Sequence, residues 1–213
     1  MQSKTNNKKK PRFFILVWAV PLIVFCLYAI YQHYVSGLPY YGQGRIPAKQ
    51  APYSSVPGFS FTNQEGKTVD SSTVDNKIWV ADFFFTSCPS ICPKMTAHLK
   101  EVQAAFKNAD DLRILSFTVD PERDNAEKLA KYADMHGIDA NSWSLLTGSK
   151  RDLYRYARHG LFVDATDGDG GAEDFIHSDR LVLIDRNGHI RGYYDGTSDI
   201  DTKLLIADIK TLL

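Results

Sequence analysis

Cysteine is scarce in this chain, with three in 213 residues. Cys26 lies in an apolar stretch near the start, so only Cys88 and Cys92 remain for the rest of the chain. Two cysteines exclude a closed zinc site of three or four thiolates within one chain. A disulfide between them would close a very short loop and would constrain the unfolded chain little. The pair therefore indicates metal or redox chemistry more than a structural crosslink.

Basic charge is also scarce once the first residues are set aside. Residues 1–12 hold five Lys or Arg and no acid, which leaves 20 basic and 25 acidic groups in residues 13–213, a net charge of −5. Binding to nucleic-acid phosphates requires a basic face, which this composition does not favour. We therefore expect no nucleic-acid partner.

Charge is absent altogether from residues 13–31, a run of nineteen residues. A helix of that length, rising about 1.5 Å per residue, roughly crosses the hydrocarbon core of a bilayer. Basic flanks stay in the cytoplasm, so residues 1–12 are expected there and the body on the extracytoplasmic, periplasmic side. A cleaved signal peptide is the main alternative, although no small-x-small site follows Ile30. The bulky Phe25 disfavours a lipoprotein anchor at Cys26.

Residues 32–55 contain prolines and glycines without a periodic apolar pattern and are predicted to be a linker. From residue 56 to residue 213, strand and helix patterns alternate. The predicted elements are a hairpin at 59–62 and 68–69, strands at 78–85, 113–119 and 143–146, helices at 93–108, 121–136 and 150–159, a hairpin at 181–184 and 190–194, and a helix at 200–213. Such alternation implies right-handed crossovers onto a mostly parallel sheet. We therefore predict an α/β, thioredoxin-like domain with an N-terminal hairpin, carried on an N-terminal transmembrane helix.

Capping residues set several of these boundaries. Asp120 followed by Pro121 predicts a helix N-cap and first helical position, and Gly137 predicts the end of that helix. Ser149 is expected to cap the next helix. Asn-Gly at residues 187–188, between two apolar runs, is a strong hairpin signal.

Cys88 and Cys92 lie where a buried strand is expected to turn into a helix. The carboxyl ends of strands in such sheets are where ligands bind. Pro93 is expected at the first helical position, which would place Cys92 at the helix N-terminus, where backbone N–H groups favour a thiolate. Two thiolates select a soft ion such as Cu(I) and leave room for a nitrogen ligand.

His177 is the best candidate for that nitrogen ligand. It follows an acidic, Gly-rich loop at residues 164–174 and precedes a predicted strand. Its position alone fits a solvated loop histidine as well as a ligand on a mobile arm. His98 is six residues past Cys92, more than a helical turn away, so we expect it on the helix surface or in packing. The others are interpreted as ordinary: His33, His136, His159 and His189.

Asp82 is unusual because it lies within the apolar strand, six residues before Cys88. A buried carboxylate is costly unless it is paired or neutral. Asp82 either tunes the pKa of the thiolates or orients them, or it lies at a solvent edge of the strand. Asp120 needs no more than a capping role.

Three separated motifs resemble the Sco/SenC family. They are DFFFTSCPSICPKM at residues 82–95, TVDPERD at 118–124, and Ile-His at 176–177 followed by LVLID at 181–185. The match covers roughly residues 55–213, in order and spacing. The resemblance implies a thioredoxin fold with Cys88, Cys92 and His177 as copper ligands. It also implies a role in assembling the copper centre of cytochrome c oxidase.

The implied partners are the copper-centre subunit of the oxidase and a copper donor protein or thiol reductant. One departure is Ser90, where many members carry an acidic residue, which affects copper affinity or docking more than the ligand set. The function is thus predicted to be copper metallochaperoning by ligand exchange, with oxidation of the pair to a disulfide abolishing binding.

The main alternative is an enzyme, a membrane-tethered thiol-disulfide oxidoreductase using Cys88 and Cys92 as its redox-active pair. Redox proteins of this fold usually place two residues between the cysteines, whereas this chain has three. A peroxidase would need an activating Arg that nothing in the sequence singles out, and a purely structural domain is the least favoured interpretation.

Overall fold

The computed structural model describes residues 21–28, 37–42, 47–48, 55–163 and 178–213. The chain divides into two compact units, Met1–Gly37 and Leu38–Leu213. In the first unit, residues 21–28 are helical. The transmembrane segment expected at residues 13–31 lies mostly outside the described residues, and none of the helices in the described ranges combines the length and apolarity that a membrane span requires.

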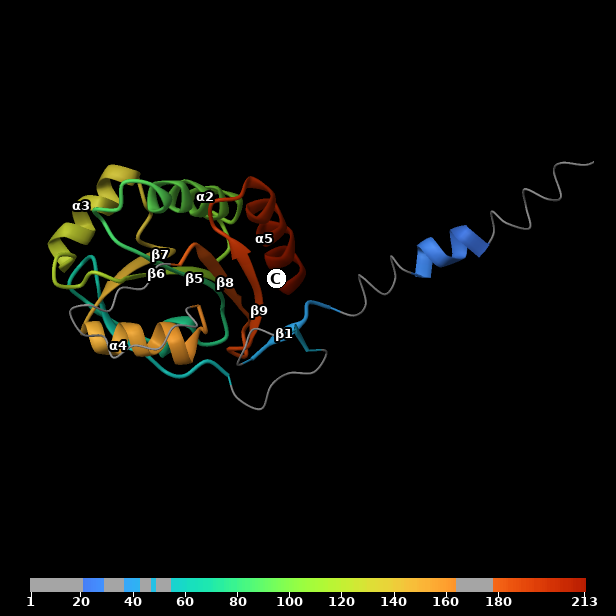
Figure 1. Cartoon of the computed structure of the whole chain (residues 1–213), viewed down its shortest axis with the longest axis horizontal. Helices are drawn as coiled ribbons and strands as arrows, with labels where there is room; N and C mark the ends of the chain where they lie inside the picture. Colours follow the sequence, from blue (N-terminus) through green and yellow to red (C-terminus); the bar gives the residue numbers. More distant parts are fainter. Residues whose placement is uncertain (1–20, 29–36, 43–46, 49–54, 164–177) are drawn as a thin grey trace, which may run out of the picture. The chain divides into compact units, whose positions relative to one another are not determined.

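The second unit is built on a single mixed sheet, seen with its helices in Figure 1. Its strand order is β2-β1-β9-β8-β5-β6-β7-β3-β4. The central strands β5, β6 and β7 are parallel, whereas β8 and β3 pair antiparallel to β5 and β7. The strands are β1 (Tyr40–Tyr41), β2 (Pro47–Ala48), β3 (Ser60–Asn63), β4 (Thr68–Asp70), β5 (Ile78–Phe84), β6 (Leu112–Thr118), β7 (Trp143–Thr147), β8 (Arg180–Ile184) and β9 (Ile190–Asp195).

Strand β5 lies in the middle of the sheet because apolar residues point to both of its faces. All seven of its residues are buried. Trp79, Ala81 and Phe83 join the apolar cluster on one face. Ile78 and Phe84 join the cluster on the other face. The predicted strand buried on both sides is therefore confirmed, to within one residue at its end.

Helices cover both faces of the sheet. The helices α2 (Ile91–Ala105), α3 (Ala126–His136) and α5 (Asp199–Leu212) lie on one face, and α4 (Lys150–Arg155) lies on the other. A π-helical turn, Tyr156–Gly160, continues α4, where the sequence predicts a single α-helix. Helices on both faces of the sheet confirm the predicted α/β class. The sheet is not mostly parallel as predicted, because among the described strands only the β5–β6 and β6–β7 pairings are parallel.

The start of α3 differs from the prediction. Asn125, not Asp120, is the N-cap, and its side chain accepts the N–H of Lys128 at 2.9 Å. The carbonyl of Asp120 instead accepts the N–H groups of Arg123 and Asp124 at 3.0 and 2.8 Å and closes a turn. The prediction was wrong because it could not see that Asp124 turns inward, which delays the helix. Gly137 ends α3 with φ 61°, as expected.

The α4 cap and the closing hairpin, both predicted from local sequence signals, are confirmed. Ser149 caps α4 by accepting the N–H of Asp152 at 3.1 Å. Strands β8 and β9 form the predicted antiparallel hairpin. At the turn between them, Gly188 has φ 76°, a conformation that glycine adopts readily.

Part of the segment 32–55 joins the sheet edge. Tyr41 pairs with Ile190 of β9. Arg191 donates hydrogen bonds to the carbonyl oxygens of Leu38 and Pro39, and its guanidinium lies 4.0 Å from the ring centroid of Tyr40. Where the structure describes this segment, the predicted linker therefore contributes two short strands.

Candidate metal centre

Cys88 and Cys92 meet at the turn between β5 and α2. The N–H of Cys88 donates to the carbonyl of Phe85 at 3.2 Å, which curls the chain after β5. The N–H of Cys92 then points at the Cys88 Sγ, with 3.5 Å between nitrogen and sulfur. Both cysteines are free thiols. Cys88 is half-buried, whereas Cys92 is 3% exposed.

The pKa values of the two thiols shift in opposite directions. Burial raises the pKa of Cys88, but hydrogen bonds from the backbone of Cys92, Ser90 and Ile91 and from the Cys92 thiol outweigh it, so the net pKa falls. Burial raises the pKa of Cys92 to about 12. The free N–H groups at the start of α2 therefore favour the Cys88 thiolate.

This corrects the sequence argument, which assigned the favoured thiolate to Cys92. Helix α2 begins at Ile91, two residues before the predicted start, so Cys92 is its second residue and Pro93 its third. At that position the Cys92 side chain packs into the apolar cluster beneath the helix. Pro93 costs no helical hydrogen bond there, because the first four N–H groups of a helix have no partner within it.

Asp82 is buried, which eliminates the solvent-edge interpretation. The Ser116 hydroxyl donates to its carboxylate, and the Trp143 indole N–H donates to Ser116 Oγ at 2.8 Å. Burial raises the pKa of Asp82 to about 7, against the lowering effect of the Ser116 hydrogen bond. A carboxylate here interacts unfavourably with a Cys92 thiolate and helps to keep that thiol protonated.

A second buried carboxylate holds the chain just before the cysteines. Asp124 accepts the N–H of Thr86 at 3.0 Å and the Thr86 hydroxyl at 2.5 Å. It also accepts the Thr118 hydroxyl at 2.7 Å. Asp124 was not among the predicted site residues, although Thr118 and Asp124 are the first and last residues of the TVDPERD motif.

Two histidines of the sequence argument, His177 and His98, have different outcomes. His177 lies outside the described residues. His98 is buried between α2 and α5, with its ring nitrogens 2.8 Å from the carbonyl of Gly196 and 2.9 Å from the carboxylate of Asp199. Its expected packing role is therefore confirmed. In the part of the chain that the structure describes, no group of three His, Cys, Asp or Glu side chains is placed to hold a metal ion.

The donors that are present fit a soft ion. The sulfurs of Cys88, in the turn after β5, and of Cys92, in the first turn of α2, are both free, and thiolate ligands favour Cu(I) over hard ions such as Mg²⁺. Residue 177, the nitrogen ligand expected from the sequence, is separated from β8 by two residues in the chain.

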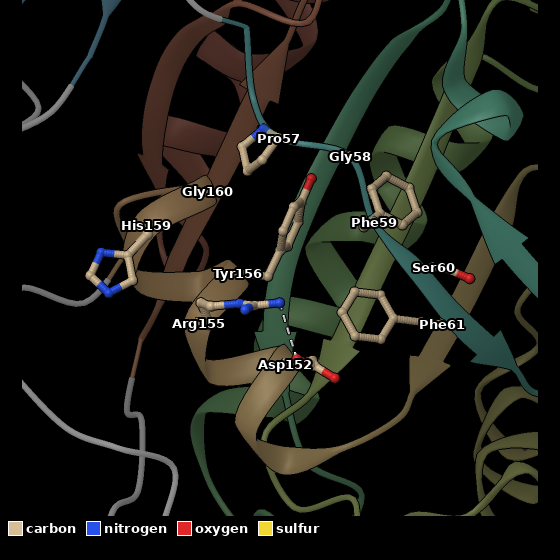
Figure 2. Close-up of a pocket in the computed structure, with 10 residues that line it drawn as sticks. All are labelled: Pro57, Gly58, Phe59, Ser60, Phe61, Asp152, Arg155, Tyr156, His159 and Gly160. Carbon is tan, nitrogen blue, oxygen red and sulfur yellow. Dashed lines mark hydrogen bonds and ion pairs between the residues drawn. The ribbon is translucent and has the colours of Figure 1, made fainter.

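A separate cavity of about 520 Å³ lies on the α4 face of the sheet, lined by Phe59, Phe61 and Tyr156 among others (Figure 2). These aromatic residues belong to the cluster opposite the one that contains Cys92. In Figure 2 the Arg155 and Asp152 side chains pair at its rim. The cavity is therefore not part of the cysteine site.

The sequence model of the SCO1/SenC family matches residues 47–213. The chain belongs to the SCO1/SenC family. An SCO1 protein homolog of Bacillus subtilis is 34% identical over 158 residues, which cover 73% of this chain and 81% of the homolog. The thioredoxin-like fold agrees with solved structures of the family.

Two of those SCO1/SenC structures are informative about chemistry. BsSco, described as a member of the Sco family of cytochrome c oxidase assembly proteins with a disulfide switch, is 32% identical, with a TM-score of 0.64 over 76% of this chain and 97% of that chain. ScoI of Bradyrhizobium japonicum, solved with copper bound, is 25% identical, with a TM-score of 0.60 over 75% of this chain and 100% of that chain.

Proposed function

We propose that this SCO1/SenC protein binds one copper ion through Cys88, Cys92 and His177 and assists maturation of the copper centre of cytochrome c oxidase. The observation that carries the proposal is the pair of free thiols where the β5–α2 turn enters the helix, one of them with a lowered pKa. The copper-bound relative supports copper as the ion, and BsSco supports the link to oxidase assembly.

The proposed delivery step is ligand exchange. Cys88 and Cys92 hold the ion as thiolates, and the neutral imidazole of His177 completes the set. Binding releases the thiol protons, so copper affinity rises with pH. His177 leaves first, because it lies on a different segment from the cysteines, and a ligand of the oxidase subunit takes its place. A copper donor protein reloads the site.

The proposed location follows from the first thirty residues. Residues 13–31 anchor the chain in a membrane as a single pass, residues 1–12 stay in the cytoplasm, and the copper site faces the extracytoplasmic side. That compartment is oxidising, so a thiol reductant is the second expected partner.

A second candidate function is thiol-disulfide exchange on the copper-site cysteines of the oxidase. The specific observation in its favour is the asymmetry of the pair. Cys88 is accessible with a lowered pKa, as an attacking thiolate requires, and Cys92 is buried and protonated, as a resolving thiol can be.

The test uses the full chain, purified in detergent, reduced and loaded with Cu(I). We expect close to one copper per chain, bound much more weakly by His177→Ala. His159→Ala, which removes an exposed histidine on the opposite face of the sheet, is the matched control and should bind like the parent. Unchanged copper binding in His177→Ala, together with efficient turnover of a disulfide substrate, would favour the oxidoreductase instead.

A further inference from the structure

The side chain of Asp124, which is hydrogen-bonded to the loop before the cysteines, has no exposed surface. Its three short contacts reach two different segments. Thr118 is the last residue of β6, and Thr86 belongs to the loop that leaves β5. Lys128 Nζ lies 3.7 Å from Asp124 Oδ1, the oxygen that accepts the Thr86 hydroxyl. A buried carboxylate with this many donors is strongly held, since hydrogen bonds to a charged acceptor are about twice as strong as neutral ones.

Thr86 is fixed by both its main chain and its side chain. Its N–H and its hydroxyl both donate to Asp124. A side chain and a backbone group held by one acceptor leave little freedom for the peptide that joins Phe85 to Thr86. The loop is therefore attached to the turn between β6 and α3 two residues before Cys88.

Phe85, on the other side of that peptide, contacts both cysteines. Its carbonyl accepts the N–H of Cys88 at 3.2 Å. Its N–H, which belongs to the preceding peptide, hydrogen-bonds the Cys92 thiol and lowers the pKa of that thiol. Movement of Phe85 would therefore change the surroundings of both cysteines.

The turn that carries Asp124, between β6 and α3, has its own hydrogen bonds. The N–H of Asp124 donates to the carbonyl of Asp120 at 2.8 Å, and the N–H of Asp120 donates to Thr118 Oγ at 3.0 Å. The turn between β6 and α3 is thus internally hydrogen-bonded, and its geometry is set independently of the cysteine loop.

From this geometry we infer that Asp124 is a positioning residue for the copper site: through Thr86 it fixes the Phe85 peptide and holds the two sulfurs at chelating separation. The inference rests on the proposed copper function for its affinity consequence. It also predicts the redox behaviour of the pair, which does not depend on copper. A loop released from Asp124 lowers the effective concentration of one thiol at the other, which weakens both copper chelation and disulfide formation.

The test compares variants of the full chain in detergent. Asp124→Ala removes all three contacts, and Thr86→Val removes only the hydroxyl contact with little change in shape. Asp124→Asn is the conservative variant, because an amide retains acceptor capacity in the same place. Asp185→Ala is the matched control. Asp185 is also a buried carboxylate that closes a turn, accepting the N–H groups of Asn187 and His189, but it lies in the β8–β9 hairpin.

Two quantities are measured on each folded variant: Cu(I) affinity, by competition with a chromogenic Cu(I) chelator, and the midpoint potential of the cysteine pair against glutathione. We expect Asp124→Ala to weaken Cu(I) roughly tenfold or more and to make the potential less negative by about 30 mV, the equivalent of tenfold for a two-electron couple. Thr86→Val should change both quantities in the same direction, Asp124→Asn should recover most of the loss, and Asp185→Ala should match the parent in both.

Parental affinity and potential in Thr86→Val and Asp124→Asn, with Asp124→Ala either parental or unfolded, would overturn the inference. An equal effect of Asp185→Ala would also overturn it, because the loss would then reflect general destabilisation. Failure of the parent to bind Cu(I) would reject the proposed function alone, and the series of midpoint potentials would still decide the role of Asp124.

Discussion

The backbone N–H of Cys92 points at the sulfur of Cys88, 3.5 Å away. This contact makes two cysteines that are equivalent in the sequence chemically different. It stabilises negative charge on Cys88, while the Cys92 sulfur lies in an apolar environment that opposes charge. Which thiol reacts first is therefore determined by the first turn of α2.

We expect Cys88 to be alkylated by iodoacetamide before Cys92 at neutral pH. Its pKa is lowered and its side chain is accessible, whereas the pKa of Cys92 is raised to about 12 and its side chain is buried. Because the thiolate is the reactive species, the rates should differ by roughly tenfold or more. Time-resolved peptide mass spectrometry on a Cys26→Ala background measures both. Equal rates would mean that the Cys92 thiol is not protected.

Asp82 predicts a specific dependence of stability on pH. Its pKa is about 7 in the folded chain against 3.8 as the ordinary value, so between these pH values the folded state keeps a proton that the unfolded state has released. The free energy of unfolding therefore falls as pH rises from about 4 to about 7, by up to about 4 kcal/mol. Urea denaturation of the parent and of Asp82→Asn at several pH values isolates this contribution.

Asp82→Asn should lack this loss, so its stability relative to the parent improves as pH rises through the window. Ser116→Ala is the informative companion, because it removes the hydrogen bond that lowers the pKa of Asp82. Its loss of stability should extend to higher pH. A constant difference between parent and Asp82→Asn from pH 4 to pH 8 would contradict the buried, neutral carboxyl.

His98 should matter for stability and not for copper. Its ring joins α2 to the start of α5 through Gly196 and Asp199. We expect His98→Ala to lose about 2 kcal/mol of unfolding free energy, from a lost charged hydrogen bond and a buried ring. Asp199→Asn should lose less, because that carboxylate is largely exposed. A His98→Ala variant that folds normally but no longer binds Cu(I) would make His98 a ligand.

The N-cap of α3 can be tested in the same way. Asn125→Ala should lower the free energy of unfolding by about 1 kcal/mol, because the N–H of Lys128 loses its acceptor. Pro121→Ala should change it much less, since Pro121 lies in the preceding turn and not in the helix. A larger loss in Pro121→Ala than in Asn125→Ala would restore the sequence-based start of the helix.

The elements that the sequence predicts well are those with local causes. Strand β5 is apolar except for Asp82, and the β8–β9 hairpin has Asn-Gly at its turn. Strand β1 could not be predicted, because its two residues have no strand pattern and their place depends on pairing with β9. The π-helical turn after α4 likewise has no sequence pattern that distinguishes it from a helix.

In the candidate site, too, the features with local causes could be predicted from the sequence and those that depend on distant residues could not. Cys88 and Cys92 are recognisable because their spacing is local. The start of α3 was misjudged because Asp-Pro has the form of a helix start, whereas one hydrogen-bond partner of the Asp124 carboxylate is a threonine 38 residues earlier, which no local pattern reveals. The lowered pKa belongs to Cys88 and not to Cys92 because α2 begins two residues earlier than predicted. A difference of two residues is within the usual uncertainty of helix boundaries.

Arg191 has a consequence for where the folded body starts. Its guanidinium contacts Asp185 at 3.0 Å and also the carbonyls of residues 38 and 39, which precede the region matched by the family. A fragment cut at residue 47 would leave a nearly buried cation without two of its acceptors and would open one edge of β9 to pairing with another chain. The shortest fragment that retains these contacts and the pairing of β1 with β9 begins at Leu38, and fragments cut later are expected to self-associate.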